Sequence, residues 1–407
     1  MADDSQNKFV RNLLNKPPKE RLDGFRNFTV KHPLLLRSFE ELWCAIRDST
    51  QGTIIFIYGP AGVGKSTLLK GIKKQIMDMS LTTMRDDPEK IPIAIVQLAA
   101  PTSGSFDWKE YFKCLLTELE EPLIDHKVAM KNVSPTIYPN VHNIYPNISE
   151  YNMQLLTSNT ASASRLRSAS EKTLHRRKPL AVLLDDAQHL GVVGSGRKLL
   201  DQLNTIKSIA DRSLATHCLC GTYELIPLRN LNGQLSRRSI DIHFGRYNAQ
   251  DKEQRQAFIN VLFTFQEHLP LVKTPDLVSR WDYFYERSIG CVGVLKDWLT
   301  RSLALALESD GQTLTLKQLE HRALSVSQCA TMLREAVDGE RESQEKEEAR
   351  ATLRMNLGLE LDQPGGEQKV VSISEAETIQ KASIRHHKHR VGARNPVRDK
   401  VGRGSHD

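Results

Sequence analysis

Residues 53–66 read Thr-Ile-Ile-Phe-Ile-Tyr-Gly-Pro-Ala-Gly-Val-Gly-Lys-Ser, an apolar run followed directly by a glycine-rich loop. The apolar run is typical of a strand that is buried on both faces. The loop matches the pattern Gly-x-x-x-x-Gly-Lys-Ser, in which glycines let successive backbone N–H groups turn toward phosphate oxygens. A helix that starts after the loop would direct its positive end at the same anion. The sequence therefore predicts a site for a nucleoside triphosphate, ATP with Mg²⁺.

Each position of the loop has an expected role. The Lys65 ammonium reaches the β- and γ-phosphates, and the Ser66 hydroxyl coordinates Mg²⁺. The residues expected to bind ATP are Gly59, Pro60, Ala61, Gly62, Val63, Gly64, Lys65, Ser66 and Thr67.

A second apolar run ends in two carboxylates. Residues 180–186 read Leu-Ala-Val-Leu-Leu-Asp-Asp, which indicates a buried strand that ends at Asp185 and Asp186. Asp185 fits the position that holds Mg²⁺, directly or through water, and Asp186 the position that orients the attacking water. Two solvated aspartates that cap the next helix are the alternative interpretation. Because Asp is one methylene shorter than Glu, we expect slow hydrolysis, which suits a switch.

Five strand signals define the fold class. Apolar runs cover residues 53–58, 93–98, 180–185 and 215–221, and Ile240, Ile242 and Phe244 alternate with polar residues. Helical stripes separate these runs, and this alternation predicts an α/β three-layer sandwich with a five-stranded, mainly parallel sheet. From about residue 250 to 335 the apolar spacing is only helical.

The chain divides into five predicted segments. They are an N-terminal arm (1–32), an α/β P-loop ATPase domain (33–248) with an inserted loop (122–150), a small helical lid domain (249–335), a charged helix or linker (336–363) and a basic disordered tail (364–407).

Charge is concentrated in the tail. Of the net charge of +7, residues 381–407 carry eight Lys or Arg and two Asp, a net of +6, which leaves +1 for residues 1–380. Such a tail can contact nucleic acid or an acidic partner, or it can serve as a solubilising tail. No apolar run approaches the ~18 residues of a membrane span. The acidic start, Met1 to Asp4, is unlike a signal peptide, so we expect a cytoplasmic location and no membrane partner.

An ordered series of motifs resembles the TnsC/TniB group of AAA+ ATPases, the target-selection regulators of transposons, which are more distantly related to MuB. The series consists of the P-loop, Leu-Asp-Asp-Ala-Gln-His-Leu at 184–190, Leu-Asn-Thr-Ile-Lys at 203–207, Cys-Gly-Thr-Tyr-Glu-Leu at 220–225, Gln-Leu-Ser-Arg-Arg at 234–238 and Gly-Cys-Val-Gly-Val-Leu-Lys at 290–296. His32-Pro33 is similar to the entry segment of that family, and the resemblance covers roughly residues 30–330.

The resemblance implies an activity and partners. It implies the AAA+ fold in a bacterial cytoplasmic protein that, with ATP, assembles into a ring or helical filament on double-stranded DNA. The assembly marks the target, recruits the transposase and meets a targeting protein of the TniQ type, and hydrolysis releases it. Some members of the family serve CRISPR-associated transposons.

The resemblance also implies roles for particular residues. Thr222 corresponds to the sensor-1 position, Arg237 or Arg238 to the arginine finger that reaches a neighbour's γ-phosphate, and Lys296 to a sensor-2 cation. For the two arginines a surface salt bridge is the alternative. The family usually has Asp-Glu where this chain has Asp-Asp, which again indicates slow hydrolysis.

Two segments lie where the family places DNA contacts. They contain the candidate DNA-binding residues Ser103, Lys109, Arg165, Arg167 and Lys172. Cations and hydroxyl groups are what binding to a phosphate backbone requires, although each of these residues could equally be part of a solvated face. Two other functions share the fold, an AAA+ replication initiator or helicase loader, and a scaffold that binds ATP and hardly hydrolyses it.

Overall fold

The computed structural model describes residues 9–101, 106–121, 163–191, 196–229, 233–309, 311–344 and 347–359. The predicted insert (122–150) and basic tail (364–407) lie outside these ranges. The described residues up to Gln344 form one compact unit, and the described residues 347–359 belong to a second. In the second unit the structure describes one helix, α18 (Glu347–Asn356).

Five short strands form the sheet predicted from the apolar runs. They are β1 (Ile54–Tyr58), β2 (Ile93–Gln97), β3 (Ala181–Asp185), β4 (Thr216–Gly221) and β5 (Ser239–His243). Their order in the sheet is β2-β3-β4-β1-β5, and every pairing is parallel. β1 is buried along its whole length because it lies inside the sheet and under helices on both faces.

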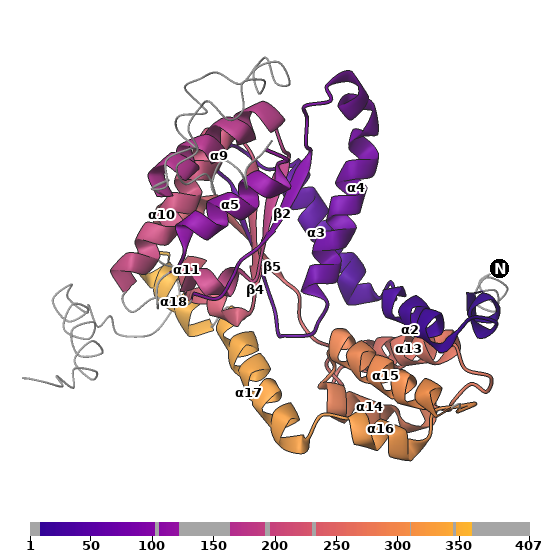
Figure 1. The fold of residues 1–407 in the computed structure, drawn as a ribbon. Coiled ribbons are helices and arrows are strands. Elements are labelled where there is room, and N and C mark those ends of the chain that lie inside the picture. Colours follow the sequence, from indigo (N-terminus) through magenta and orange to yellow (C-terminus); the bar gives the residue numbers. More distant parts are fainter. Residues whose placement is uncertain are drawn as a thin grey trace, which may run out of the picture. The chain divides into compact units, whose positions relative to one another are not determined.

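Helices cover both faces of this sheet (Figure 1). One face packs against α3 (Pro33–Arg47) and α4 (Lys65–Asp86), and the other against α5 (Trp108–Glu118), α9 (Ala163–Arg177) and α10 (Gly196–Ser213). The helix before β1 is α3, in which Pro33 occupies the first turn and the His32 ring accepts a hydrogen bond from the Leu35 N–H. The predicted three-layer α/β sandwich is confirmed.

Short elements follow the carboxyl ends of β3 and β4. They are the 3₁₀ helices η2 (Ala187–Gly191) and η3 (Tyr223–Leu225), then α11 (Ile226–Arg229) and α12 (Gly233–Arg238), which leads into β5. Because the strands are parallel, their carboxyl ends meet at one edge of the sheet. The P-loop, the two aspartates and Thr222 all begin at that edge.

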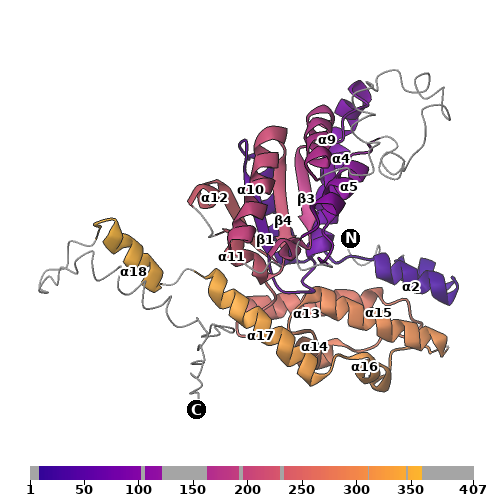
Figure 2. The same cartoon turned by 60° about the vertical axis from the view of Figure 1, so that its left-hand side comes forward.

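The helical group that follows the sheet consists of α13 (Lys252–His268), η4 (Val278–Arg280), α14 (Trp281–Ser288), α15 (Val292–Glu308), α16 (Leu316–Arg322) and α17 (Val326–Ser343). The buried Trp298 lies in its core. α2 (Pro18–Asn27) lies beside α15 (Figure 2), and Phe25 and Val30 of the predicted arm are part of the same core. α17 continues through residues 335 and 336, where the sequence suggested a boundary. No helix in the described ranges is long and apolar enough to cross a membrane.

Candidate nucleotide site

The glycines of the P-loop occupy places that a side chain would not fit. Gly62 and Gly64 have φ angles of 80° and 113°, in the left-handed region that L-residues avoid. A Cβ atom on Gly59 would lie 2.0 Å from the carbonyl oxygen of Phe244, which follows β5. Gly64 directly precedes α4, whose first N–H groups have no carbonyl partner within the helix. The loop and the helix start therefore form a concave set of N–H donors suited to phosphate.

The Lys65 ammonium lies over this loop. Its Nζ donates to the carbonyl oxygens of Gly59 and Pro60, both at 2.9 Å. Burial lowers the pKa of Lys65, while the nearby Asp185 and Asp186 raise it. A cation that is largely removed from water gains most from an additional anion, so its position fits a bound phosphate.

Ser66 and Asp185 meet in the way a magnesium site needs. Ser66 Oγ donates to Asp185 Oδ2 at 2.7 Å, although the two residues come from α4 and from the end of β3. Mg²⁺ prefers oxygen ligands, and with a nucleotide it usually binds one or two protein groups, phosphate oxygens and waters. The described residues contain no group of three or more His, Cys, Asp or Glu that could hold a metal by itself. The pair thus fits Mg²⁺ held jointly with a nucleotide.

Two glutamine amides hold the second carboxylate. Asp186 accepts hydrogen bonds from Gln97 Nε2 at 3.1 Å and from Gln188 Nε2 at 3.2 Å. The Gln188 Oε1 in turn accepts from the Thr222 backbone N–H at 3.3 Å. Asp186 has a φ of 55°, a left-handed conformation that Asp tolerates better than most residues. In the sequence, Gln188 was only one position of the family motif. In the structure its amide links the Asp186 carboxylate to Thr222 at the end of β4.

The Thr222 hydroxyl is a buried group without a partner. Its Oγ1 has no hydrogen bond within the described part of the chain, and the residue lines the same cavity as the P-loop. A buried polar atom that lacks a partner costs free energy, about 1–3 kcal/mol. A phosphate oxygen or a phosphate-bound water in the cavity would satisfy it.

One cavity of about 480 Å³ contains these groups. Among the predicted site residues its walls include Ala61, Gly62, Val63, Gly64, Lys65, Ser66, Thr67, Asp185, Asp186, Thr222 and Lys296. The sequence did not predict the arm residues that complete it, which are Arg26, Phe28, Thr29, Val30 and His32. The volume lies in the range of small-molecule sites, ~300–1,000 Å³. Gly59 and Pro60 lie outside the walls and contact the site through their carbonyl groups.

The helical group that follows the sheet, called the lid below, is hydrogen-bonded directly to the P-loop through α15. The Gly62 carbonyl oxygen accepts from the N–H groups of Gly293 at 2.7 Å and of Val294 at 3.2 Å, in the first turn of α15. A Cβ on Gly293 would lie 2.4 Å from that oxygen. The absence of a side chain at Gly293 therefore allows the lid helix to approach the loop this closely.

Lys296, the predicted sensor-2 cation, binds the arm. Its Nζ donates to the carbonyl oxygens of Phe25 and of Phe28, the latter at 2.8 Å, and lies 3.9 Å from the centre of the Phe25 ring. Burial lowers the pKa of Lys296 to about 8. In this structure the ammonium thus anchors the arm to the lid at the wall of the cavity.

The two candidates for the arginine finger lie far from their own P-loop. Arg237 and Arg238 precede Ser239, which pairs with Ile54 at the start of β1, whereas the P-loop follows the other end of β1. At ~3.3 Å per residue, the strand alone separates these ends by about 13 Å. Arg238 pairs with Asp211 at 2.9 Å, which matches the salt-bridge alternative, while Arg237 is exposed to solvent. A finger role for either residue requires a neighbouring subunit.

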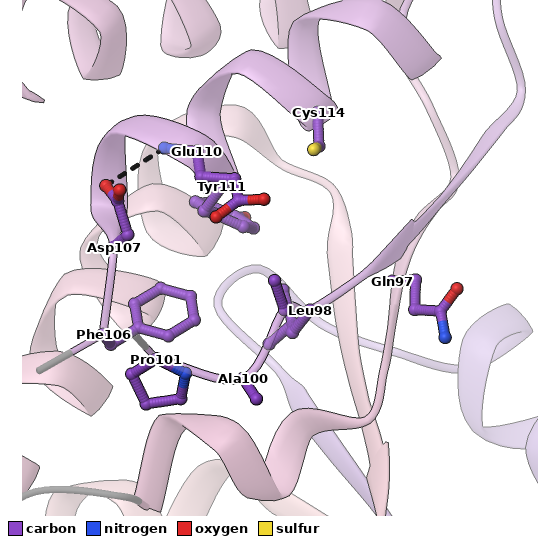
Figure 3. Close-up of a pocket in the computed structure, with 10 residues that line it drawn as sticks. Gln97, Leu98, Ala100, Pro101, Phe106, Asp107, Glu110, Tyr111 and Cys114 are labelled. Carbon is purple, nitrogen blue, oxygen red and sulfur yellow. Dashed lines mark hydrogen bonds between the residues drawn. The ribbon is translucent and has the colours of Figure 1, made fainter. Parts of the chain in front are cut away.

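The candidate DNA contacts within the described residues lie on α5 and α9. Lys109 is exposed near the start of α5. Its chain neighbours Asp107 and Glu110 line a small hollow between that helix and the end of β2 (Figure 3). Arg165 and Lys172 lie on α9. Arg167, also on α9, is bound within the protein, because its Nε pairs with Glu171 at 2.9 Å and its Nη2 donates to Ser208 at 2.8 Å. Ser103 lies outside the described residues.

Comparison with known proteins agrees with the fold. The family described as AAA domain matches residues 47–228. No curated protein matches the sequence. Solved structures with a similar fold include ORC1 of Aeropyrum pernix in complex with DNA, at 13% identity over 72% of this chain and 65% of that chain, with a TM-score of 0.47. ORC2 of the same organism, in ADPNP–ADP complexes, has 14% identity over 74% and 71%, with a TM-score of 0.44.

A third structure of this kind is the Walker-type ATPase PABY2304 of Pyrococcus abyssi, at 15% identity over 85% of this chain and 88% of that chain, with a TM-score of 0.41. Similarities this distant carry no information about substrate or partner. The match to residues 47–228, together with the sheet order and the P-loop, defines this part of the chain as an AAA+ ATPase domain.

Proposed function

We propose that this chain is an ATP-driven switch whose catalytic site lies between two copies of itself. Lys65, Ser66 and Asp185 would bind ATP and Mg²⁺ in one subunit. The observation that carries the proposal is the placement of Arg237 and Arg238 at the opposite edge of the sheet, which prevents either from completing its own site. Of the two, Arg237 is the better finger, because Arg238 already pairs with Asp211.

Each group around the expected γ-phosphate position would have its own role in hydrolysis. Lys65 would neutralise phosphate charge, Mg²⁺ on Ser66 and Asp185 would polarise the phosphoryl group, and Asp186 would orient the attacking water. The amides of Gln97 and Gln188 hold Asp186 in place. Its short side chain keeps the carboxylate close to the end of β3, so we expect turnover to be slow. Assembly in the ATP state and release after hydrolysis follow from a finger that senses the γ-phosphate.

We propose further that the switch regulates DNA transposition in the manner of TnsC/TniB proteins. The motifs that carry this resemblance include the P-loop, the aspartate pair, Thr222 and Gly293, and these four lie around one cavity or contact its walls. In this proposal the chain forms a ring or filament on double-stranded DNA in the bacterial cytoplasm. It recruits a transposase and meets a targeting protein of the TniQ type.

Electron microscopy with double-stranded DNA and a non-hydrolysable ATP analogue tests the assembly. We expect rings or filaments for the wild-type protein and none for Lys65→Ala, which cannot hold the triphosphate. Arg237→Ala should bind ATP with unchanged affinity while losing at least tenfold in turnover. Monomers of wild-type protein under these conditions would refute the assembly.

A transposase-capture assay tests the biological role. Wild-type assemblies should retain a transposase on DNA-coated beads in an ATP-dependent manner. Assemblies that form on DNA but retain a replicative helicase and no transposase would instead establish the replication-initiator or helicase-loader alternative.

Variants of α9 test the DNA contact. The logarithm of affinity for duplex DNA falls with the logarithm of salt concentration, with a slope of about −0.9 per phosphate contacted. If Arg165 and Lys172 each contact a phosphate, Arg165→Ala with Lys172→Ala should make the slope shallower by about 2. Arg167→Ala is the matched control, because its guanidinium is bound to Glu171 and Ser208. An equal slope in wild type and double variant would remove α9 from the DNA interface.

A further inference from the structure

A groove lies next to the nucleotide cavity, between α17 and the end of β4. It has a volume of about 450 Å³, and Ala61 and Thr222 line both the groove and the nucleotide cavity. Gly339 of α17 packs directly on the Tyr223 ring, where a Cβ would lie 2.1 Å from Cγ. The groove is therefore held against the nucleotide site by a close helix contact.

Acidic side chains form the rim of this groove. Glu335, Asp338 and Glu342 are three and four residues apart, so they share one face of α17, and all three are exposed and line the groove. Glu224 of η3 adds a fourth carboxylate. Within the described residues, the ion pair found for these four groups is a long one, Asp338 with Arg341 at 4.0 Å.

Such a row of like charges is unfavourable in an isolated subunit. Like-charged pairs at these spacings destabilise a helix. The floor of the groove is largely apolar, with Pro60, Tyr223, Ile289, Met332 and Ala336. An apolar floor with an acidic rim fits a partner surface that carries several cations on long aliphatic stems.

The same chain has a cationic surface at the opposite edge of its sheet. Lys207 of α10 and Arg237 and Arg238 of α12 line one recess there. Because these three side chains share a recess, a neighbouring subunit that brings Arg237 to a γ-phosphate also brings the other two cations close by. The acidic groove begins at Ala61 and Thr222, directly beside the position the phosphate would occupy.

We infer that the acidic groove of one subunit receives Lys207 of a second copy of this chain, together with Arg238, whose guanidinium also pairs with Asp211 of its own subunit. The inference rests on the proposed assembly and adds to it a second contact, beside the nucleotide. The groove and the cationic recess are different surfaces, so the contact is head-to-tail and generates a ring or a filament. Opposite charges at such a boundary fix the register of the subunits and disfavour other partners.

Charge reversal in the full-length protein tests the inference. The variant Glu335→Lys with Asp338→Lys and Glu342→Lys should bind ATP as wild type does. In sedimentation velocity with the ATP analogue and duplex DNA, it should need roughly tenfold more protein, or more, to reach half-assembly. The control variant Asp282→Lys with Glu308→Lys and Glu320→Lys reverses three exposed acids of the lid outside the groove and should assemble as wild type does.

A compensating change identifies the occupant. The compensating variant adds Lys207→Glu and exchanges the pair Arg238→Glu with Asp211→Lys, which keeps an ion pair within the subunit. With Arg237 retained, it should restore assembly to within a few-fold of wild type. If the groove variant assembled as wild type does, the inference would be overturned and the proposed function would stand. If the groove variant lost assembly and the compensating change did not restore it, a different surface would occupy the groove. Wild-type protein that stays monomeric would refute the proposed assembly itself.

Discussion

Replacing Gly293 by Ala is expected to separate the lid from the P-loop. The new Cβ would lie 2.4 Å from the Gly62 carbonyl oxygen, whereas ordinary contact begins at 3.4 Å, so one partner must move by about 1.0 Å (3.4 − 2.4). Gly293 does not have a positive φ, so alanine introduces no backbone strain of its own. The effect should come from the contact alone.

The magnitude follows from the hydrogen bonds at this contact. A displacement of this size breaks or weakens the bonds from the Gly293 and Val294 N–H groups to Gly62, now 2.7 and 3.2 Å long. At a net ~0.5–1.5 kcal/mol each, their loss amounts to about 1–3 kcal/mol. Because the cavity has walls from both the loop and the lid, this cost should appear in nucleotide affinity, as a rise in Kd of about 5- to 150-fold.

Calorimetric titration with ATP and with ADP measures this rise. The affinities for ATP and for ADP should fall by a similar factor, because the contact does not involve the γ-phosphate. Gly191→Ala is the matched control, since a Cβ there has no neighbour within 4 Å. If Gly293→Ala bound ATP as tightly as wild type does, the lid contact would contribute nothing to nucleotide binding and the reasoning would fail.

Three other variants test single contacts. Asp186→Glu, which restores the longer carboxylate of the family pattern, should raise the ATP turnover number severalfold without changing ATP affinity, and an unchanged turnover number would show that side-chain length does not limit hydrolysis. Lys296→Met should lower the affinities for ATP and ADP equally if the ammonium serves to anchor the arm. A selective loss of ATP affinity would establish the sensor-2 role. Burial lowers the pKa of His32 from 6.5 to about 4, so the unfolded chain binds more protons in this interval and stability falls as pH decreases through it. At about 1.4 kcal/mol per pH unit this loss is about 3 kcal/mol, and His32→Asn, which can still accept from the Leu35 N–H, should remove it from the pH dependence of urea unfolding.

The sheet could be predicted because local sequence determines it. A strand buried on both faces must be apolar at every position, and the run at 54–58 meets that condition, so its limits follow from composition. The P-loop could be predicted for a similar reason, since its glycines answer a backbone requirement within the loop itself. Both features depend on neighbours in the chain.

The lid side of the site could not be predicted in this way. The contact between Gly62 and Gly293 joins residues 231 positions apart (293 − 62), and the sequence of neither segment predicts it. Phe25 lies in a mostly polar stretch, and its apolar neighbours at a spacing of three residues, Leu22 and Phe28, form too short a pattern to predict burial in the lid core. The charge of Arg167 is visible in the sequence, but its partners on α9 and α10 are not, and they decide whether it can meet DNA.

The direction of β5 gives each subunit a polarity. A strand parallel to β1 must start at the edge opposite the P-loop, so in the proposed assembly every subunit would have one end that receives an arginine and one that supplies it. In the proposed assembly, an open row of n subunits contains n − 1 complete sites and one terminal subunit whose ATP lacks a finger. That terminal ATP would outlast the others, which makes the two ends of the row chemically unequal. A closed ring has no such end, so ring and row of equal size should differ in turnover by the fraction 1/n.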